Sequence, residues 1–180
     1  MKGYIPHQSA RGYLAHTIYQ QMRKNKKIWI VTGDLGYKMW DPIQSKYPER
    51  FINVGAAEQA MMGIAVGLAL EGMIPIVYSI TTFLLQRPFE TIRNYVHFEK
   101  IPVKLIGSGR EKDYLHDGIS HWPLQDKRIL KIFRNIEARW PETKEEIPPL
   151  VKEMLKSDKP YYINLRRVLL EIRLLRSFGR

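Results

Sequence analysis

The chain has 180 residues, 44% hydrophobic and 26% charged, which suits one domain with a sizeable core and excludes a wholly disordered protein. It contains no cysteine, so disulfides, thiolate nucleophiles and cysteine-ligated metal sites are excluded. A net charge of +11 at pH 7 suggests an anionic partner, such as a phosphorylated small molecule, a nucleic acid or an acidic protein chain.

Strand-like and helix-like segments alternate along the chain, which predicts an α/β three-layer sandwich with a mainly parallel sheet of roughly six strands. In chain order we expect a helix (9–24), a strand (28–32), one or two helical turns (43–47), a strand (51–54), a helix (57–71) and a strand (74–80). A helix (87–100), a strand (103–106), a polar loop (110–122), a helix (124–133), a strand (136–138), a helix (142–156) and a strand (160–166) follow. Pro148 and Pro149 either interrupt the last helix or delay its start. Residues 1–167 form the expected domain, and residues 168–180 a basic tail.

Ligands of open α/β sheets bind at the carboxyl ends of the strands. Gly33-Asp34-Leu35-Gly36 follows the first expected strand, and Gly55 follows the second. The long polar loop follows a strand that ends in Gly107-Ser108-Gly109. The candidate site is therefore expected where these loops meet.

Glu58 lies in the first turn of the expected helix 57–71, which is apolar almost all round and is expected to be buried on most faces. One interpretation is a helix-start carboxylate, stabilised by the helix dipole. The other is a carboxylate in a dry site, which needs a partner and can share a proton with a ring nitrogen. Gly63 and Gly67 would let another backbone approach this helix closely.

Several blocks together resemble the pyrimidine-binding domain of thiamine-diphosphate enzymes of the transketolase class, in particular the C-terminal halves of split transketolases. The beta subunits of 2-oxo acid dehydrogenases and deoxyxylulose-phosphate synthase are similar too. The blocks are 33–35 (GDL), 51–67 (FINVGAAEQAMMGIAVG), 83–94 (FLLQRPFETIRN), 117–126 (DGISHWPLQD) and 164–167 (NLRR). Their order and spacing cover about residues 9–167, and the combination is specific although each block alone is weak.

The resemblance implies roles for residues near the cofactor. Glu58 matches the glutamate that hydrogen-bonds the aminopyrimidine ring and acts as a catalytic acid and base through it. Phe83 matches the aromatic residue that packs on the aminopyrimidine face, and Leu84 could occupy that place if the register differs by one residue. Asp34 matches an aspartate near the cofactor at the boundary between subunits, although a strand-end aspartate that caps the next turn is equally plausible.

The resemblance also implies substrate contacts. Asp117 and His121 match residues that hydrogen-bond the ketose donor, and His121 could also exchange a proton with a developing alkoxide. The alternative is a polar surface loop, because Asp-Gly is a common turn signal. Arg167 matches an arginine that contacts sugar phosphates, with Arg166 as an alternative. His116 has a weaker claim.

Three departures from the family pattern lie in this block, and we expect them to affect the identity of the donor or acceptor rather than the cofactor chemistry. They are Ser120 for the usual Thr, Trp122 for Gln, and Gln125 for an acidic residue.

The sequence shows no GDG start and no later asparagine pair, with which the family binds diphosphate through a metal, and we expect the family's third domain to be absent. The resemblance therefore implies that thiamine diphosphate is shared with a separate diphosphate-binding subunit, which would ligate the Mg²⁺, so that no metal ligand is expected in this chain. Two subunits of each kind would form a heterotetramer, with helix 57–71 at or near an interface.

We expect the enzyme to transfer a two-carbon ketol unit between sugars, either sugar phosphates or activated sugars, and to act only with its partner subunit. The alternatives are one chain of a 2-oxo acid decarboxylase, dehydrogenase or acyl-transferring enzyme, and a non-catalytic regulatory or scaffolding domain. A nucleic-acid-binding module is disfavoured, because the sequence has no aromatic-interleaved RNA motif and no recognition-helix pattern. The sequence has no apolar run long enough to span a membrane, and its first ten residues have no apolar core of a signal peptide. We therefore expect a cytoplasmic protein.

Overall fold

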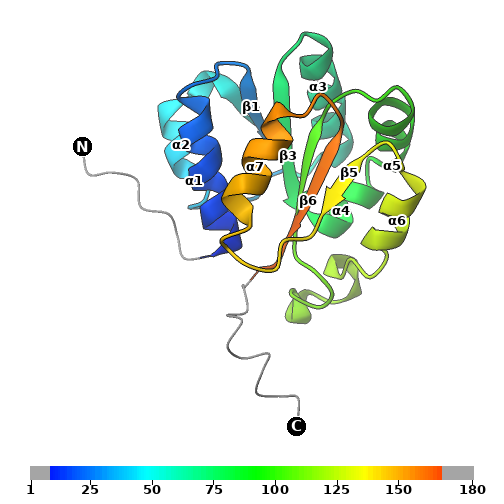
Figure 1. Ribbon diagram of the computed structural model, residues 1–180. Coiled ribbons are helices and arrows are strands. Elements are labelled where there is room, and N and C mark those ends of the chain that lie inside the picture. Colours follow the sequence, from blue (N-terminus) through cyan, green and yellow to red (C-terminus); the bar gives the residue numbers. More distant parts are fainter. Residues whose placement is uncertain (1–8, 168–180) are drawn as a thin grey trace.

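The computed structural model describes residues 9–167 (Figure 1). The strands are β1 (Ile28–Thr32), β2 (Phe51–Asn53), β3 (Ile74–Ile80), β4 (Lys104–Ser108), β5 (Glu137–Arg139) and β6 (Tyr161–Leu165). The α-helices are α1 (Ala10–Met22), α2 (Asp41–Lys46), α3 (Glu58–Leu70), α4 (Thr81–Gln86), α5 (Phe89–Thr91), α6 (Asp126–Ile132) and α7 (Ile147–Lys156). Between them lie the 3-10 turns η1 (Pro48–Arg50), η3 (Leu115–Asp117) and η4 (Ile119–His121), and the π-helical segment η2 (Ile92–Phe98).

The six strands form one sheet in the order β2-β1-β3-β4-β6-β5, and every pair is parallel. The chain runs outward from β1 to β2 and then returns past β1 to β3, so the direction of winding reverses between β1 and β3. A crevice at the carboxyl edge of such a switch point is where open α/β sheets place their ligands.

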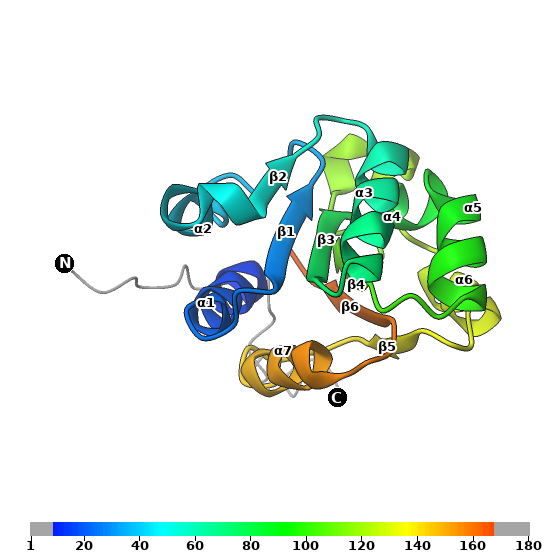
Figure 2. The ribbon, with the colours of Figure 1, turned by 90° about the horizontal axis from the view of Figure 1, so that it is seen from above.

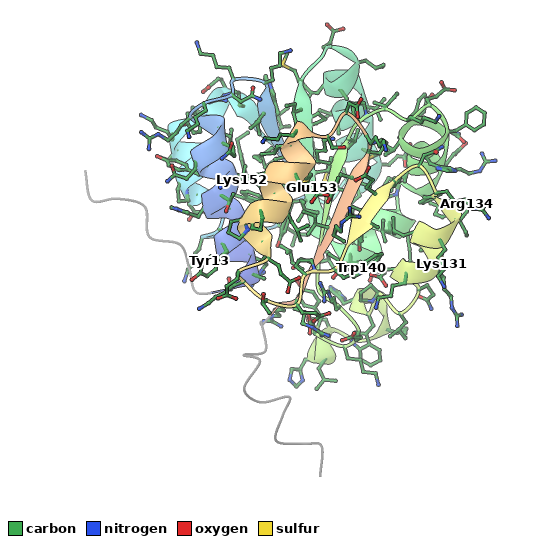
Figure 3. The ribbon with its side chains drawn as sticks, viewed as in Figure 1. Tyr13, Lys131, Arg134, Trp140, Lys152 and Glu153 are labelled. Atoms are coloured by element: carbon green, nitrogen blue, oxygen red, sulfur yellow. The ribbon has the colours of Figure 1, made fainter. Side chains whose placement is uncertain are left out.

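Helices cover both faces of the sheet, as Figure 2 shows from above. Side chains of α1, α2 and α7 form a core with one face of the sheet, and side chains of α3, α4, η2 and α6 form a second core with the other face. Glu153, labelled on α7 in Figure 3, accepts hydrogen bonds from the Tyr161 hydroxyl at 2.7 Å and from Arg139 at 3.2 Å, which fixes α7 against β5 and β6. The predicted α/β three-layer fold is confirmed.

The prediction that helix 57–71 is buried on most faces is wrong. In α3, Met61, Ala65 and Ala69 pack into the core, whereas Gly63, Ile64 and Gly67 are exposed. Only one side of α3 faces the sheet, and within the described residues Ala60, Gly63, Ile64, Gly67 and Leu70 on its other side are exposed. The near-uniform apolar pattern therefore combines a core face with a face that is exposed in this chain.

Prolines explain where two helices begin. The helix expected at residues 87–100 begins at Phe89, directly after Pro88, and continues as the π-helical segment η2. The helix expected from residue 142 begins at Ile147 and carries Pro148 and Pro149 in its first turn, where a missing backbone N–H leaves no hydrogen bond unmade. The prolines therefore delay the start of α7. The short helix α4 was not predicted.

No helix within the described residues is long and apolar enough to cross a membrane. The predicted basic tail at 168–180 lies outside the described residues.

Lys104 of β4 is buried (1% exposed) at the amino edge of the sheet, where its Nζ donates hydrogen bonds to the carbonyl oxygens of Ser157 at 2.8 Å and Lys159 at 2.5 Å. It thereby satisfies carbonyl groups that follow the end of α7. Burial lowers the pKa of Lys104 from 10.5 to about 8, because the interior disfavours its charged form.

Between pH 8 and pH 10 the unfolded chain binds more protons at Lys104 than the folded chain, so this residue's contribution to stability rises with pH. We expect the unfolding free energy of the wild-type chain to gain about 2 kcal/mol between pH 7 and pH 10 relative to Lys104→Met, measured by urea denaturation. A difference between the two proteins that is independent of pH would contradict the assignment of this titration to Lys104.

Candidate functional site

The loops after β1, β2, β3 and β4 meet at the carboxyl edge of the sheet. Gly33 follows β1, and a Cβ at this position would lie 3.2 Å from the Gly55 carbonyl oxygen and 3.7 Å from Glu58 Oε1. Gly55 has a φ of +71°, a conformation that glycine adopts without strain. These two glycines allow the first turn of α3 to sit close against the end of β1.

Glu58 is the first residue of α3 and is 3% exposed. Its Oε2 accepts a hydrogen bond from a terminal guanidinium nitrogen of Arg87 at 2.7 Å, and its Oε1 accepts one from Ser79 Oγ at 3.4 Å. The helix dipole also favours negative charge at this end. Glu58 is therefore a helix-start carboxylate that is also buried beside a charged partner.

Arg87 lies at the C-cap of α4, and its Cζ is 3.8 Å from the centroid of the Phe83 ring. The guanidinium thus rests on the aromatic face while it donates to Glu58. Its side chain is 46% exposed, so the ion pair joins a buried carboxylate to a half-exposed cation. Arg87 therefore links the Phe83 ring to Glu58, and both Phe83 and Arg87 are carried by α4, which begins directly after β3.

A row of ring contacts continues from Phe83 across the loop after β4. The His121 ring lies 4.9 Å from Phe83 in an edge-to-face arrangement, and Tyr114 lies 5.9 Å from His121. The Arg167 guanidinium carbon lies 5.3 Å from the Tyr114 ring centroid. The structure therefore brings Glu58, Phe83, His121 and Arg167 together in one row, with Arg87 and Tyr114 between them.

A buried arginine anchors this loop. Arg110 is 5% exposed and donates hydrogen bonds to Asn164 Oδ1 at 2.9 Å, to the carbonyl oxygens of Pro141 and Asn164 at 2.7 Å each, and to Glu142 at 2.7 Å. Gly109 has a φ of +89°, and a Cβ there would collide with the Tyr114 ring. The loop thus starts from a fixed arginine and a position that only glycine fits.

A cavity of about 530 Å³ opens beside this row, between α4 and the loop. Its lining residues are Thr82, Phe83, Gln86, Arg87, Ile119, Ser120, Trp122 and Gln125. All three residues that depart from the family pattern, Ser120, Trp122 and Gln125, face this cavity. Their substitution therefore alters the wall of a cavity next to Phe83.

The remaining predicted site residues lie apart from the row. Leu84 is fully buried in the core between α4 and the sheet, so Phe83 is the residue of the pair that faces the cavity. Asp117 is exposed in η3. Asp34 is exposed after β1 with a φ of 56°, and its Oδ1 accepts a hydrogen bond from the Tyr37 hydroxyl at 2.8 Å, which raises the pKa of Tyr37.

The two arginines at the end of β6 differ in their contacts. Arg166 is ion-paired with Glu111 at 2.7 Å and with Glu142 at 3.2 Å. Arg167 is exposed, its guanidinium lies over Tyr114, and its backbone N–H donates to Asp113 at 2.8 Å. Of the two, Arg167 is the one whose guanidinium joins the row.

Arg87 and Tyr114 were not singled out from the sequence. Arg87 stands inside the block 83–94, four residues after Phe83, and a cation one helical turn from a site aromatic residue could have pointed to it. Tyr114 gives no such signal, because its position depends on how the loop folds around Gly109. Within residues 9–167 no cluster of three or more His, Asp or Glu side chains is placed to hold a metal ion.

Glu58 is thus a buried carboxylate at the carboxyl edge of a parallel α/β sheet, where this class of domain places its ligands. Residues 7–172 match the family described as "Transketolase, pyrimidine binding domain". The chain belongs to this family, whose members take part in thiamine-diphosphate-dependent enzymes.

Relatives and a solved structure agree with this assignment. The chain is 29% identical over 158 residues to a putative transketolase C-terminal section from Methanocaldococcus jannaschii, a match that covers 87% of this chain and 50% of the relative. It is 30% identical over 124 residues to one of the subunits of an apulose-4-phosphate transketolase from Actinobacillus succinogenes, covering 69% and 40%. A split-gene transketolase, described as an inactive beta4 tetramer, superposes with a TM-score of 0.79 at 28% identity, covering 91% of this chain and 53% of that one. The chain spans about half of the length of these proteins, or less.

The Glu58–Arg87 pair predicts a stability effect that does not depend on ligand. Arg87→Met should lower the unfolding free energy by about 1–3 kcal/mol, because it leaves a buried carboxylate without its cation. Glu58→Gln in the same background should restore part of that loss. Chemical denaturation of the two single variants and the double variant measures the coupling between the residues.

The matched control is Arg93→Met, since Arg93 is exposed on η2 and donates only to its neighbour Asn94 among the described residues. It should change stability by less than about 0.5 kcal/mol. Strictly additive effects of the Glu58 and Arg87 substitutions would show that the two side chains are not coupled.

Proposed function

We propose that the chain is the pyrimidine-binding subunit of a two-component thiamine-diphosphate enzyme that transfers a two-carbon ketol unit between sugars. The observation that carries this proposal is the buried Glu58 carboxylate, which Arg87 links to the face of Phe83, in one row with His121 and Arg167. The names of split-transketolase relatives support the reaction class. The proposal places the functional domain within residues 1–167 and the basic tail at 168–180 outside it.

The residues present fit the aminopyrimidine half of thiamine diphosphate. This ring needs a carboxyl group that shares a proton with its ring nitrogen and an aromatic face to stack on, and we propose that Glu58 and Phe83 supply them. When bound, the cofactor supplies a carbon that attacks a carbonyl group and holds the resulting negative charge. Leu84 has no part in this site in our proposal, and Asp34 would lie near its edge.

Glu58 is proposed to hold a proton at the pyrimidine nitrogen and to move it during turnover. Its burial keeps water away from this proton, and Ser79 and the helix dipole fix its orientation. Replacing Glu58 by a side chain of similar shape that cannot exchange a proton therefore tests this proposed role directly.

His121 and Arg167 are proposed to hold the sugar. His121 Nδ1 lies 2.9 Å from Ser120 Oγ, so Nε2 is the ring nitrogen proposed to exchange a proton with a substrate oxygen. Arg167 would bind a phosphate or another anionic group at the far end of the row, where a guanidinium can make two hydrogen bonds. Asp117 would contact a sugar hydroxyl from the same loop.

A separate subunit is proposed to supply the diphosphate site and its Mg²⁺. The name of one relative as a C-terminal section, and of another as one of several transketolase subunits, supports a split enzyme. The exposed apolar face of α3, with Gly63 and Gly67, is the surface proposed to pack in the assembly, a heterotetramer with two subunits of each kind.

Glu58→Gln tests the proposed cofactor role. In the complex with the diphosphate-binding subunit, thiamine diphosphate and Mg²⁺, we expect kcat for a ketose phosphate to fall by at least about 100-fold, because an amide cannot exchange the proton. Steady-state kinetics measures the loss, and thermal denaturation checks that the variant folds. Glu90→Gln, at an exposed site on α5, is the matched control and should keep full activity. Full activity in Glu58→Gln would refute the role.

His121→Ala tests the proposed substrate role. We expect kcat/KM for the ketose donor to fall by about 100-fold or more, whereas His116→Ala, at an exposed position in η3, should have little effect. Equal effects of the two substitutions would remove His121 from the donor site. A wild-type complex that consumes pyruvate but not ketoses would instead favour the 2-oxo acid alternative.

A further inference from the structure

Arg87 makes both of the contacts that the aminopyrimidine ring needs. Its guanidinium donates to Glu58 Oε2 at 2.7 Å, and the same group lies 3.8 Å above the centroid of the Phe83 ring. At 3.8 Å the two planar groups are in van der Waals contact, so no second ring fits between them.

The guanidinium group is a chemical mimic of the edge of an aminopyrimidine. It is planar, it presents N–H donors in its plane to a carboxylate, and its face stacks on an aromatic ring. In the proposed function an aminopyrimidine binds the Glu58 carboxyl group and a face of Phe83, the two groups that Arg87 contacts. The two occupants therefore exclude each other.

We propose that Arg87 is an autoinhibitory contact of the unassembled chain, which fills the aminopyrimidine position and must leave it before thiamine diphosphate binds. This inference rests on the proposed function and adds a regulatory step to the same site. The chain on its own then has a closed state, in which Glu58 is satisfied without cofactor.

The surroundings of Arg87 permit this exchange. Its side chain is 46% exposed, whereas the Glu58 side chain is 2% exposed, so the arginine is the partner that is free to rotate away. The cavity of about 530 Å³ next to it, lined also by Gln86, Ser120 and Gln125, offers polar groups to a displaced guanidinium. Arg110 provides the contrast, since it is 5% exposed and bound on several sides.

A half-exposed ion pair is weak, so the closed state should reduce affinity rather than prevent binding. If Arg87 occupies the position in about nine-tenths of the molecules, the apparent affinity for an aminopyrimidine falls about tenfold. Removing the guanidinium should restore the tenfold loss in apparent affinity. A lysine at this position, which is charged but has no planar group, should restore part of it.

The first test uses the full chain alone and 4-amino-2-methylpyrimidine, with binding followed by NMR titration. We expect Arg87→Ala to bind about tenfold more tightly than wild type, Arg87→Lys to lie between them, and the control Arg93→Ala to equal wild type. Arg87→Met replaces Arg87→Ala if thermal denaturation shows that the alanine variant does not fold. Equal or weaker binding by the Arg87 variants than by wild type overturns the inference.

The second test measures the Kd of thiamine diphosphate with Mg²⁺ by calorimetry on the complex with the diphosphate-binding subunit. We expect Arg87→Ala to lower this Kd by about tenfold, and Arg93→Ala to leave it unchanged. If the wild-type complex binds thiamine diphosphate and Arg87→Ala binds it equally well or more weakly, this inference alone is overturned. No binding of thiamine diphosphate by any variant overturns the proposed function together with it.

Discussion

The site depends on one buried charge, the Glu58 carboxylate at the first turn of α3. Its negative charge is held by the helix dipole, by Ser79 and by the Arg87 guanidinium. A carboxylate so little exposed to water requires such partners, and each comes from a different element of the fold. The close approach at Gly33 and Gly55, the start of α4 and the end of β3 all serve to bring these partners to one point.

The parallel sheet explains why residues distant in sequence meet there. The loops after β1 to β4, and the end of β6, all emerge at the same edge, so Gly33, Glu58, Arg87, His121 and Arg167 lie near one another. The loop after β4 is the least regular part of this arrangement, and Arg110 and Gly109 fix its course. Ser120, Trp122 and Gln125, which depart from the family pattern, line the cavity beside Phe83, whereas the hydrogen bonds to the Glu58 carboxylate come from Ser79 and Arg87.

The fold and the position of Glu58 could be predicted because short apolar runs, helical patterns and glycine turns are local signals. The burial of α3 on one side only could not be predicted, because the type of an apolar residue does not tell whether it packs in the core or lies on a face that is exposed in the single chain. The start of α7 depends on Pro148 and Pro149, whose pattern allowed either an interrupted helix or a delayed start. The start of α5 directly after Pro88 was not predicted. Arg87 and Tyr114 were missed because their roles arise from contacts across α4 and the loop after β4.

The most direct test of the account is the distance between a Glu58 carboxylate oxygen and the pyrimidine ring nitrogen in a structure of the co-purified complex with thiamine diphosphate. The account predicts a hydrogen bond of about 2.6–3.2 Å, with the ring on Phe83 and Arg87 rotated away. A cofactor bound elsewhere, with Glu58 still paired to Arg87, would contradict it.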